Sequence, residues 1–219
     1  MLAVGGSVRA TYANLARRPD ALAGVGVSTL DELHPLDRRD PRGFGMRLRQ
    51  DLGPHASQID DSATFCSDAS DPDEEARRVA AVVASGVLGM AVLGLGRNGH
   101  LAFNEPGVPF NAVSRWISLI PDTVAHLGGQ AAIAPATGAM TLSLSTLMLA
   151  REVLLVVDGD KQWALHGLLW GPLTTDLPAS LLRLHPCATV LTTETVVGSG
   201  LSALRGLPGV TLTGSPRSG

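Results

Sequence analysis

The sequence predicts a single-domain α/β protein built on a parallel, doubly wound, Rossmann-like sheet with helices on both faces. Short apolar segments alternate with segments of helical character, which is typical of such sheets. Several of these apolar segments are continuous and rich in valine, as in strands buried on both faces. The chain has 219 residues, 45% of them hydrophobic and 17% charged, enough for one sizeable core. No repeat or long linker divides it.

The expected elements follow one another in the order of a parallel sheet. Strands are expected at residues 2–4, 25–30, 90–95, 116–120, 153–157 and 188–192. Helices are expected at residues 9–18, 44–52, 71–84, in the later part of 139–149, and from 161 to about 169. Asp71-Pro72 is a good helix start, and Gly159-Asp160 precedes the last helix. We therefore expect one domain over residues 1–197, followed by a loosely held tail over 198–219, where Gly, Ser and Pro are frequent.

Composition excludes several classes of protein. The net charge is -3 and the two signs are interspersed, which argues against a nucleic-acid or membrane-surface binder. The uncharged run at 79–96 contains several glycines, so it is interpreted as a helix end, a turn and a buried strand rather than a membrane span. Cys66 and Cys187 match no metal spacing, and Arg9 interrupts the first apolar run too early for a secretory signal. We expect a cytoplasmic protein with reduced thiols and no metal site.

Residues 92–107, VLGLGRNGHLAFNEPG, are the most informative stretch. A buried strand enters a glycine-rich turn that carries Asn98, His100 and Glu105, the usual components of a proton-transfer site at the carboxyl end of a strand. The same turn fits the dinucleotide pattern GxGxxG. Pro106 cuts any following helix short, and no acidic residue lies at the usual distance on a second strand, so NAD binding is disfavoured.

Other strand ends carry polar groups that would meet at the same edge of the sheet. Gly5-Gly6-Ser7 offers backbone N–H groups and a hydroxyl to a phosphate, or is an ordinary tight turn. Asp31 is placed to abstract a carbon-bound proton, or is a helix cap or surface acid. Lys161 lies at the positive end of a helix, which favours an anion between them, or is a solvated lysine.

Residues 93–106 resemble the glucosamine-6-phosphate deaminase/isomerase family, whose fingerprint is close to L-G-x-G-x-[DN]-G-H-[IL]-[AG]-F-N-E-P. Three other segments are similar to the family: LAVGGSVRATYANL to its phosphate loop, STLDEL to its F-N-[ML]-D-E-Y stretch, and EVLLVVDGDKQWAL to the segment carrying its phosphate-binding lysine. The resemblance extends, with gaps, over most of residues 1–195. The related 6-phosphogluconolactonases share the Gly-His pair but typically continue with T-A-S-L-F-P.

The resemblance implies a cofactor-free enzyme that converts glucosamine 6-phosphate and water, or a close amino-sugar analogue, to fructose 6-phosphate and ammonia. In that reaction His100 would open the sugar ring, helped by Glu105 and Asn98. Asp31 would then move a proton from C2 to C1. Asn98 stands where many members have aspartate, and asparagine supplies a hydrogen bond without negative charge.

The resemblance also implies that Gly5, Gly6, Ser7 and Lys161 hold the sugar phosphate. One expected group is missing, because residues 121–129, PDTVAHLGG, lack the arginine that grips the phosphate in the family. Losing one bidentate donor weakens phosphate binding by about a few kcal/mol unless another residue replaces it. Arg9 and Arg115 are the candidates for this replacement.

Two other functions stay open at this point. The first is a sugar-lactone hydrolase of the 6-phosphogluconolactonase type, and the second is a non-catalytic sugar-phosphate sensor on the same fold. The chain also starts almost at its first strand, where family members usually carry a helix and a linker. An apolar face left uncovered there would need a partner, which leaves room for a homo-oligomer.

Overall fold

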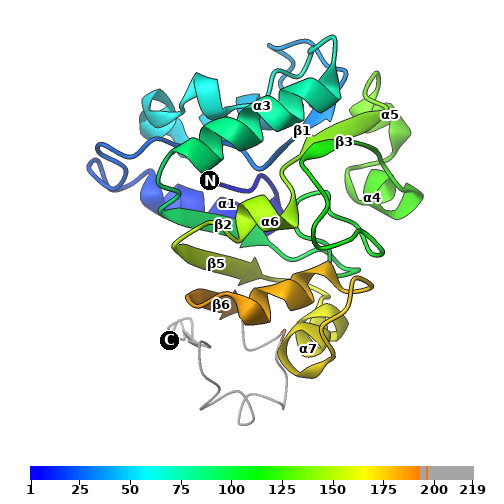
Figure 1. Cartoon of the computed structure of the whole chain (residues 1–219). Coiled ribbons are helices and arrows are strands. Elements are labelled where there is room, and N and C mark those ends of the chain that lie inside the picture. The colour runs from blue at the N-terminus through cyan, green and yellow to red at the C-terminus, as the bar shows by residue number, and fades with distance from the viewer. Residues whose placement is uncertain (193–195, 197–219) are drawn as a thin grey trace.

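The structure is a computed structural model that describes residues 1–192 and 196 (Figure 1). Its centre is a parallel sheet of β2 (Met90–Gly94), β5 (Glu152–Val157) and β6 (Ala188–Thr192), in the order β2-β5-β6. Single parallel bridges extend this sheet beyond β2 and connect Leu2 to both Val92 and Thr29, and Val27 to Ile59. The α/β fold class predicted from the sequence is confirmed. The predicted tail, 198–219, lies outside the described residues.

Two predicted strands are much shorter than expected. Residues 2–4 and 25–30 form isolated bridges instead of continuous ladders. Gly5 begins the turn into the first helix at once, so the first strand has no room to continue. The second segment leaves the parallel sheet after Thr29, because the chain passes directly into a strand of another sheet at Asp31.

A second, antiparallel sheet was not predicted. It consists of β1 (Asp31–His34), β4 (Gly138–Thr141) and β3 (Arg115–Ser118), in the order β1-β4-β3. All four residues of β4 are buried, so its sequence GAMT shows no alternation from which a strand could be recognised. In Figure 1, β1 and β3 lie to one side of the parallel sheet, next to α4 and α5.

The helices cover the two sheets. They are α1 (Gly6–Leu15), α2 (Phe44–Leu52), α3 (Pro72–Ser85), α4 (Pro121–His126), α5 (Gln130–Ile133), α6 (Leu144–Leu147) and α7 (Gln162–Trp170). Short 3₁₀ turns occur at Gly53–Gln58, Asp61–Ala63 and Pro178–Leu184. As predicted, Asp71 starts α3, where its side chain accepts a hydrogen bond from the backbone N–H of Glu74 at 2.9 Å. Among the described helices, none is long and apolar enough to span a membrane.

Two apolar clusters position the functional loops. The larger one joins the parallel sheet to the helices, and the smaller one lies beneath the antiparallel sheet. In the smaller cluster the ring of Phe44, at the start of α2, stacks on that of Phe103 with centroids 5.8 Å apart. Because Phe103 belongs to the glycine-rich motif, this contact fixes the motif against β1 and α2.

Candidate active site

The loop after β2 folds tightly around His100. The backbone N–H of Gly96 donates to the carbonyl of His100 at 3.0 Å, and a Cβ at Gly96 would lie 2.5 Å from the imidazole. Only glycine leaves room for the ring there. Gly99 has a φ of +85° and Ala102 one of +50°, a conformation that non-glycine residues rarely adopt. The loop therefore stores backbone strain where it presents His100.

His100, Glu105 and Asn98 form one hydrogen-bonded cluster. The Nδ1 atom of His100 lies 3.2 Å from Oε2 of Glu105, and Nδ2 of Asn98 donates to that same oxygen at 2.8 Å. The other carboxylate oxygen, Oε1, accepts a hydrogen bond from the hydroxyl of Thr123, in α4, at 2.5 Å. Asn98 also accepts from the backbone N–H of His100 at 3.2 Å.

The electrostatic state of Glu105 follows from these bonds. Burial favours the neutral acid and would raise its pKa, but the hydrogen bond and charge of His100, together with the bonds from Thr123 and Asn98, leave the pKa lowered. Glu105 is thus held as a carboxylate against one nitrogen of the imidazole. The other nitrogen, Nε2, forms no hydrogen bond among the described residues, so it is free to exchange a proton with a ligand.

A second cluster joins the beginning of α1 to the end of β5. The Nζ atom of Lys161 donates to Ser7 Oγ at 2.8 Å and to Asp158 Oδ1 at 3.0 Å, and Ser7 also donates to Asp158. A Cβ at Gly5 or Gly6 would meet nothing within 4 Å, so a ligand can approach this backbone. Ser7 lies in the first turn of α1, because that helix begins at Gly6 and not, as predicted, at residue 9. The cluster therefore combines a helix N-terminus with an ammonium group.

Asp31 is the first residue of β1 rather than a residue beyond a strand end. It is 7% exposed, and its carboxyl group forms no hydrogen bond among the described residues. Burial, and to a smaller extent the charge of Glu32, raises its pKa to about 8. Its neighbour Glu32 has a structural position instead, because it accepts backbone N–H bonds from Leu33, Phe44 and Gly45 at 2.6 to 2.9 Å and so caps α2.

β4 connects Asp31 to the motif loop. Asp31 pairs with Thr141 in the antiparallel ladder, and the hydroxyl of Thr141 accepts a hydrogen bond from the backbone N–H of Phe103 at 3.2 Å. The carbonyl of Leu142, the next residue of the chain, accepts a hydrogen bond from Nδ2 of Asn104 at 2.8 Å. Asp31 and the loop carrying His100 are thus both attached to Thr141, although no described hydrogen bond joins Asp31 to His100.

The two arginines suggested as replacements lie elsewhere. Arg9 pairs with Asp51 of α2 at 3.5 Å, and Arg115 donates to the carbonyl of Val113. The sequence reasoning missed His126 instead. Its pKa is lowered, first by burial and then by the positive charges of Lys161, Arg97 and His100, while the charge of Asp158 opposes them.

The position of His126 in the sequence could have pointed to it, because it lies in the segment 121–129, which lacks the family's phosphate-binding arginine. Thr123 precedes it by three residues in α4, and residues three apart lie on one face of a helix. Since Thr123 is bonded to Glu105, that face is turned toward the loop that carries His100. His126 therefore lies near enough to both His100 and Lys161 for their charges to act on it.

Known proteins resemble this chain over nearly its whole length. Residues 1–192 match the family described as glucosamine-6-phosphate isomerases/6-phosphogluconolactonase. The glucosamine-6-phosphate deaminase of Corynebacterium glutamicum (strain R) is 32% identical, over 88% of this chain and 79% of its own, and that of Leuconostoc citreum is 31% identical, over 87% and 82%.

Solved structures agree with this assignment. A monomeric glucosamine-6-phosphate deaminase superposes with a TM-score of 0.81 at 29% identity, covering 90% of this chain and 86% of its own. The 6-phosphogluconolactonase of Leishmania guyanensis gives a TM-score of 0.68 at 19% identity, over 90% and 85%, a likeness of fold alone. The chain belongs to the family of glucosamine-6-phosphate isomerases and 6-phosphogluconolactonases.

Proposed function

We propose that this protein converts glucosamine 6-phosphate and water to fructose 6-phosphate and ammonia. The observation that carries the proposal is the cluster in which Glu105 and Asn98 hold His100, on a loop that is bonded to Thr141, the residue that pairs with the buried, unbonded Asp31. The named relatives at 31 to 32% identity support deamination over lactone hydrolysis. Two groups able to move protons are what an aldose-to-ketose conversion requires.

His100 opens the sugar ring in the proposed reaction. Its Nε2 atom takes the proton of the anomeric hydroxyl and returns it to the ring oxygen, which breaks the C1–O5 bond and gives the open aldehyde. Glu105 stabilises the imidazolium formed between these transfers, because its carboxylate lies 3.2 Å from Nδ1. Asn98 and Thr123 hold the carboxylate in place by donating hydrogen bonds to its two oxygens, Oε2 and Oε1.

Asp31 carries out the isomerisation. As a carboxylate it removes the proton from C2 while the C1 carbonyl oxygen takes up a proton from the substrate's own ammonium group, which gives a neutral enolamine. It then returns its proton to C1, which leaves a protonated imine at C2 and restores the carboxylate. Water adds to this imine, and ammonia leaves as the C2 carbonyl of the ketose forms. A carboxylate in an apolar site is a stronger base than one in water, so its burial suits abstraction from carbon.

Ser7 and Lys161 bind the phosphate in this proposal, with the backbone of Gly5 and Gly6 at the N-terminus of α1. His126 supplies the further cationic contact that the missing arginine would give. Asp158 bonds to both Lys161 and Ser7, and its carboxylate has to yield to the incoming phosphate. We further propose that the enzyme acts in the cytoplasm, which suits its two free cysteines.

The decisive experiment measures ammonia release and lactone hydrolysis by the same preparation. Glucosamine 6-phosphate, galactosamine 6-phosphate and unphosphorylated glucosamine are tested for ammonia, and 6-phosphogluconolactone for acid production. We expect ammonia from a phosphorylated amino sugar, and a loss of about a hundredfold or more in His100→Ala and Asp31→Asn. Faster hydrolysis of the lactone than release of ammonia would assign the chain to the lactonases, and binding without turnover would make it a sensor.

A further inference from the structure

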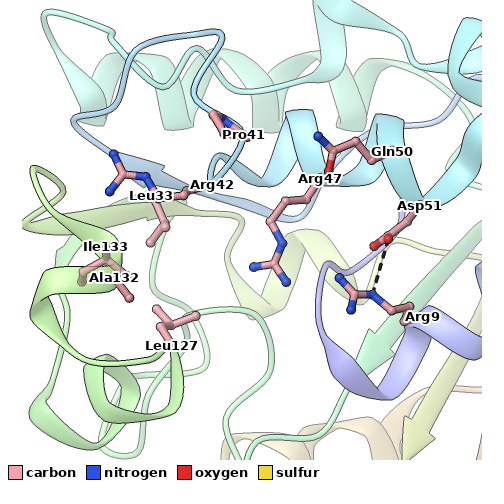
Figure 2. A pocket seen from close by; sticks show the side chains of 10 residues that line it. All are labelled: Arg9, Leu33, Pro41, Arg42, Arg47, Gln50, Asp51, Leu127, Ala132 and Ile133. Atoms are coloured by element: carbon pink, nitrogen blue, oxygen red, sulfur yellow. Dashed lines mark ion pairs between the residues drawn. The ribbon is translucent and has the colours of Figure 1, made fainter.

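A pocket lined by three arginines lies on the other side of α1 from the phosphate cluster. Its volume is about 240 Å³, and its walls come from α1, β1, α2 and the segment containing α4 and α5. The lining residues are Arg9, Leu33, Pro41, Arg42, Arg47, Gln50, Asp51, Leu127, Ala132 and Ile133. Figure 2 shows the guanidinium of Arg47 pointing into the space between Arg9 and Leu127. Positive charge therefore gathers in a hollow of the size of a small molecule.

The charges in the pocket are unequally compensated. Arg42 is neutralised by Asp40, to which its Nε and Nη2 atoms donate at 2.9 and 2.6 Å. Arg9 forms an ion pair with Asp51, in which its Nε atom lies 3.5 Å from Oδ1 of the carboxylate. The guanidinium of Arg47 forms no hydrogen bond or ion pair with any described residue, and it lies 5.7 Å from the centre of the Phe44 ring.

Glu32 does not neutralise Arg47. The charge of Arg47 lowers the pKa of Glu32, so the two groups sense each other. Both oxygens of that carboxylate, however, already accept the backbone N–H groups at the start of α2. The guanidinium of Arg47 is left facing that of Arg9, with Asp51 as the only carboxylate among the residues that line the pocket. An anion between two such guanidinium groups forms charge-assisted, bidentate hydrogen bonds and removes their repulsion.

The pocket is separate from the phosphate cluster. Ser7 and Arg9 lie two residues apart on α1, so their side chains diverge by roughly 200° around the helix axis. Ser7 contacts Lys161 and Asp158, whereas Arg9 contacts α2. Leu33, which lines the pocket, shares a face of β1 with Asp31, because alternate residues of a strand point the same way. The pocket thus opens on the face of β1 that also carries the proposed base, Asp31.

We propose that this pocket is a second anion site, in which Arg47 and Arg9 bind a small carboxylate or phosphate independently of the substrate phosphate. Its occupant contacts α1 and α2 on one wall and Leu127, Ala132 and Ile133 on the other. Because the second wall continues α4, which carries Thr123 and His126, a bound anion ties that segment to α2. The site is therefore placed to act on catalysis as an effector site.

Malonate is a suitable probe because it is a small dianion that carries no sugar. Its binding is measured by calorimetry on the full-length wild type and on Arg47→Gln, Arg9→Gln, Lys161→Ala and Arg49→Gln. Arg49 is the matched control: it lies on the same helix and loses the same charge, but pairs with Asp61 away from the pocket. We expect Arg47→Gln to weaken malonate binding by about tenfold or more, Arg9→Gln by less, and Arg49→Gln and Lys161→Ala by less than about twofold.

Two further measurements keep the test decisive. Arg47→Lys retains the positive charge but lacks the planar guanidinium, so its affinity for malonate should lie between those of the wild type and Arg47→Gln. Its circular dichroism spectrum should match that of the wild type, which shows that the fold persists. Malonate should also bind in the presence of saturating glucosamine 6-phosphate. Malonate binding that depends on Lys161 instead of Arg47, or that the sugar phosphate abolishes, overturns the proposal. Since calorimetry reads binding directly, this result stands whether or not the protein releases ammonia.

Discussion

Ser7 and Lys161 lie 154 positions apart in the chain, yet the ammonium group of the lysine donates a hydrogen bond to the serine hydroxyl at 2.8 Å. The contact brings the start of α1 to the loop between β5 and α7. The first segment follows the parallel bridge at Leu2 and the second follows β5, so both leave the same edge of the parallel sheet. The Asp158 carboxylate bonds to both groups and so occupies part of the space that an anion would take.

Removing the ammonium group should weaken substrate binding more than it slows the chemistry. We expect Lys161→Ala to raise the KM for glucosamine 6-phosphate by about ten- to a hundredfold, with kcat reduced much less, because the phosphate is bound equally in the ground state and the transition state. Initial rates of ammonia release measure both constants. Arg151→Ala removes one charge from an exposed position and serves as the control. A fall in kcat at unchanged KM would place Lys161 in the chemical step instead.

Lys161 is the only lysine in the sequence, which permits a direct chemical test of its site. The other primary amine, at Met1, is buried and donates to the carbonyl of Met90 at 2.8 Å. After treatment with an amine-acylating reagent, mass spectrometry of proteolytic peptides measures the labelling of Lys161 separately from that of Met1. We expect glucosamine 6-phosphate to slow the labelling of Lys161 and unphosphorylated glucosamine to leave it unchanged. Equal labelling with and without the sugar phosphate would contradict the assigned phosphate site.

Asp31 should govern the rise of activity with pH. Its pKa is raised to about 8 by burial, and only the ionised form can accept the C2 proton. As the pH increases through this value the base loses its own proton, so kcat/KM should rise and then level off. Profiles of ammonia release between about pH 6 and pH 9 test this, because kcat/KM reports the ionisation of the free enzyme. The residual activity of Asp31→Asn should lack the rise, and an unchanged profile in that variant would exclude Asp31 as the base.

The sequence predicted the loop after β2 better than its surroundings. Glycines and polar groups at fixed spacing identified Asn98, His100 and Glu105, and the structure joins all three because their contacts are local. β4 could not be found in this way, since a buried strand without alternation looks like any apolar segment. Thr123 and His126 were missed for a different reason: their partners lie far away in the sequence, and only the packing of α4 brings them to the site.

The hydroxyl of Thr123 should keep Glu105 ionised. Thr123→Val removes its hydrogen bond to Oε1 while keeping the side-chain shape, which leaves a buried carboxylate oxygen without a partner. We expect the pKa of Glu105 to rise, kcat to fall by about tenfold, and the free energy of unfolding to drop by about 1–3 kcal/mol. Steady-state kinetics and urea denaturation measure the two effects. Thr123→Ser restores the hydroxyl and should recover most of kcat; if it behaves like the valine variant, the hydrogen bond is not the cause.

His126 should make phosphate binding depend on pH. Burial and the nearby positive charges lower its pKa, so in the free protein its imidazole is mostly neutral at about pH 7. A phosphate dianion placed beside it favours the protonated form, and binding should therefore take up a proton. The KM for glucosamine 6-phosphate should be lower near pH 6.5 than near pH 8, by about threefold to tenfold.

His126→Gln removes the ionisable group but can still donate a hydrogen bond, so its KM should vary less over this range. Calorimetric titrations in two buffers with different ionisation enthalpies count the protons taken up, and an equal count in wild type and His126→Gln would remove His126 from the phosphate site.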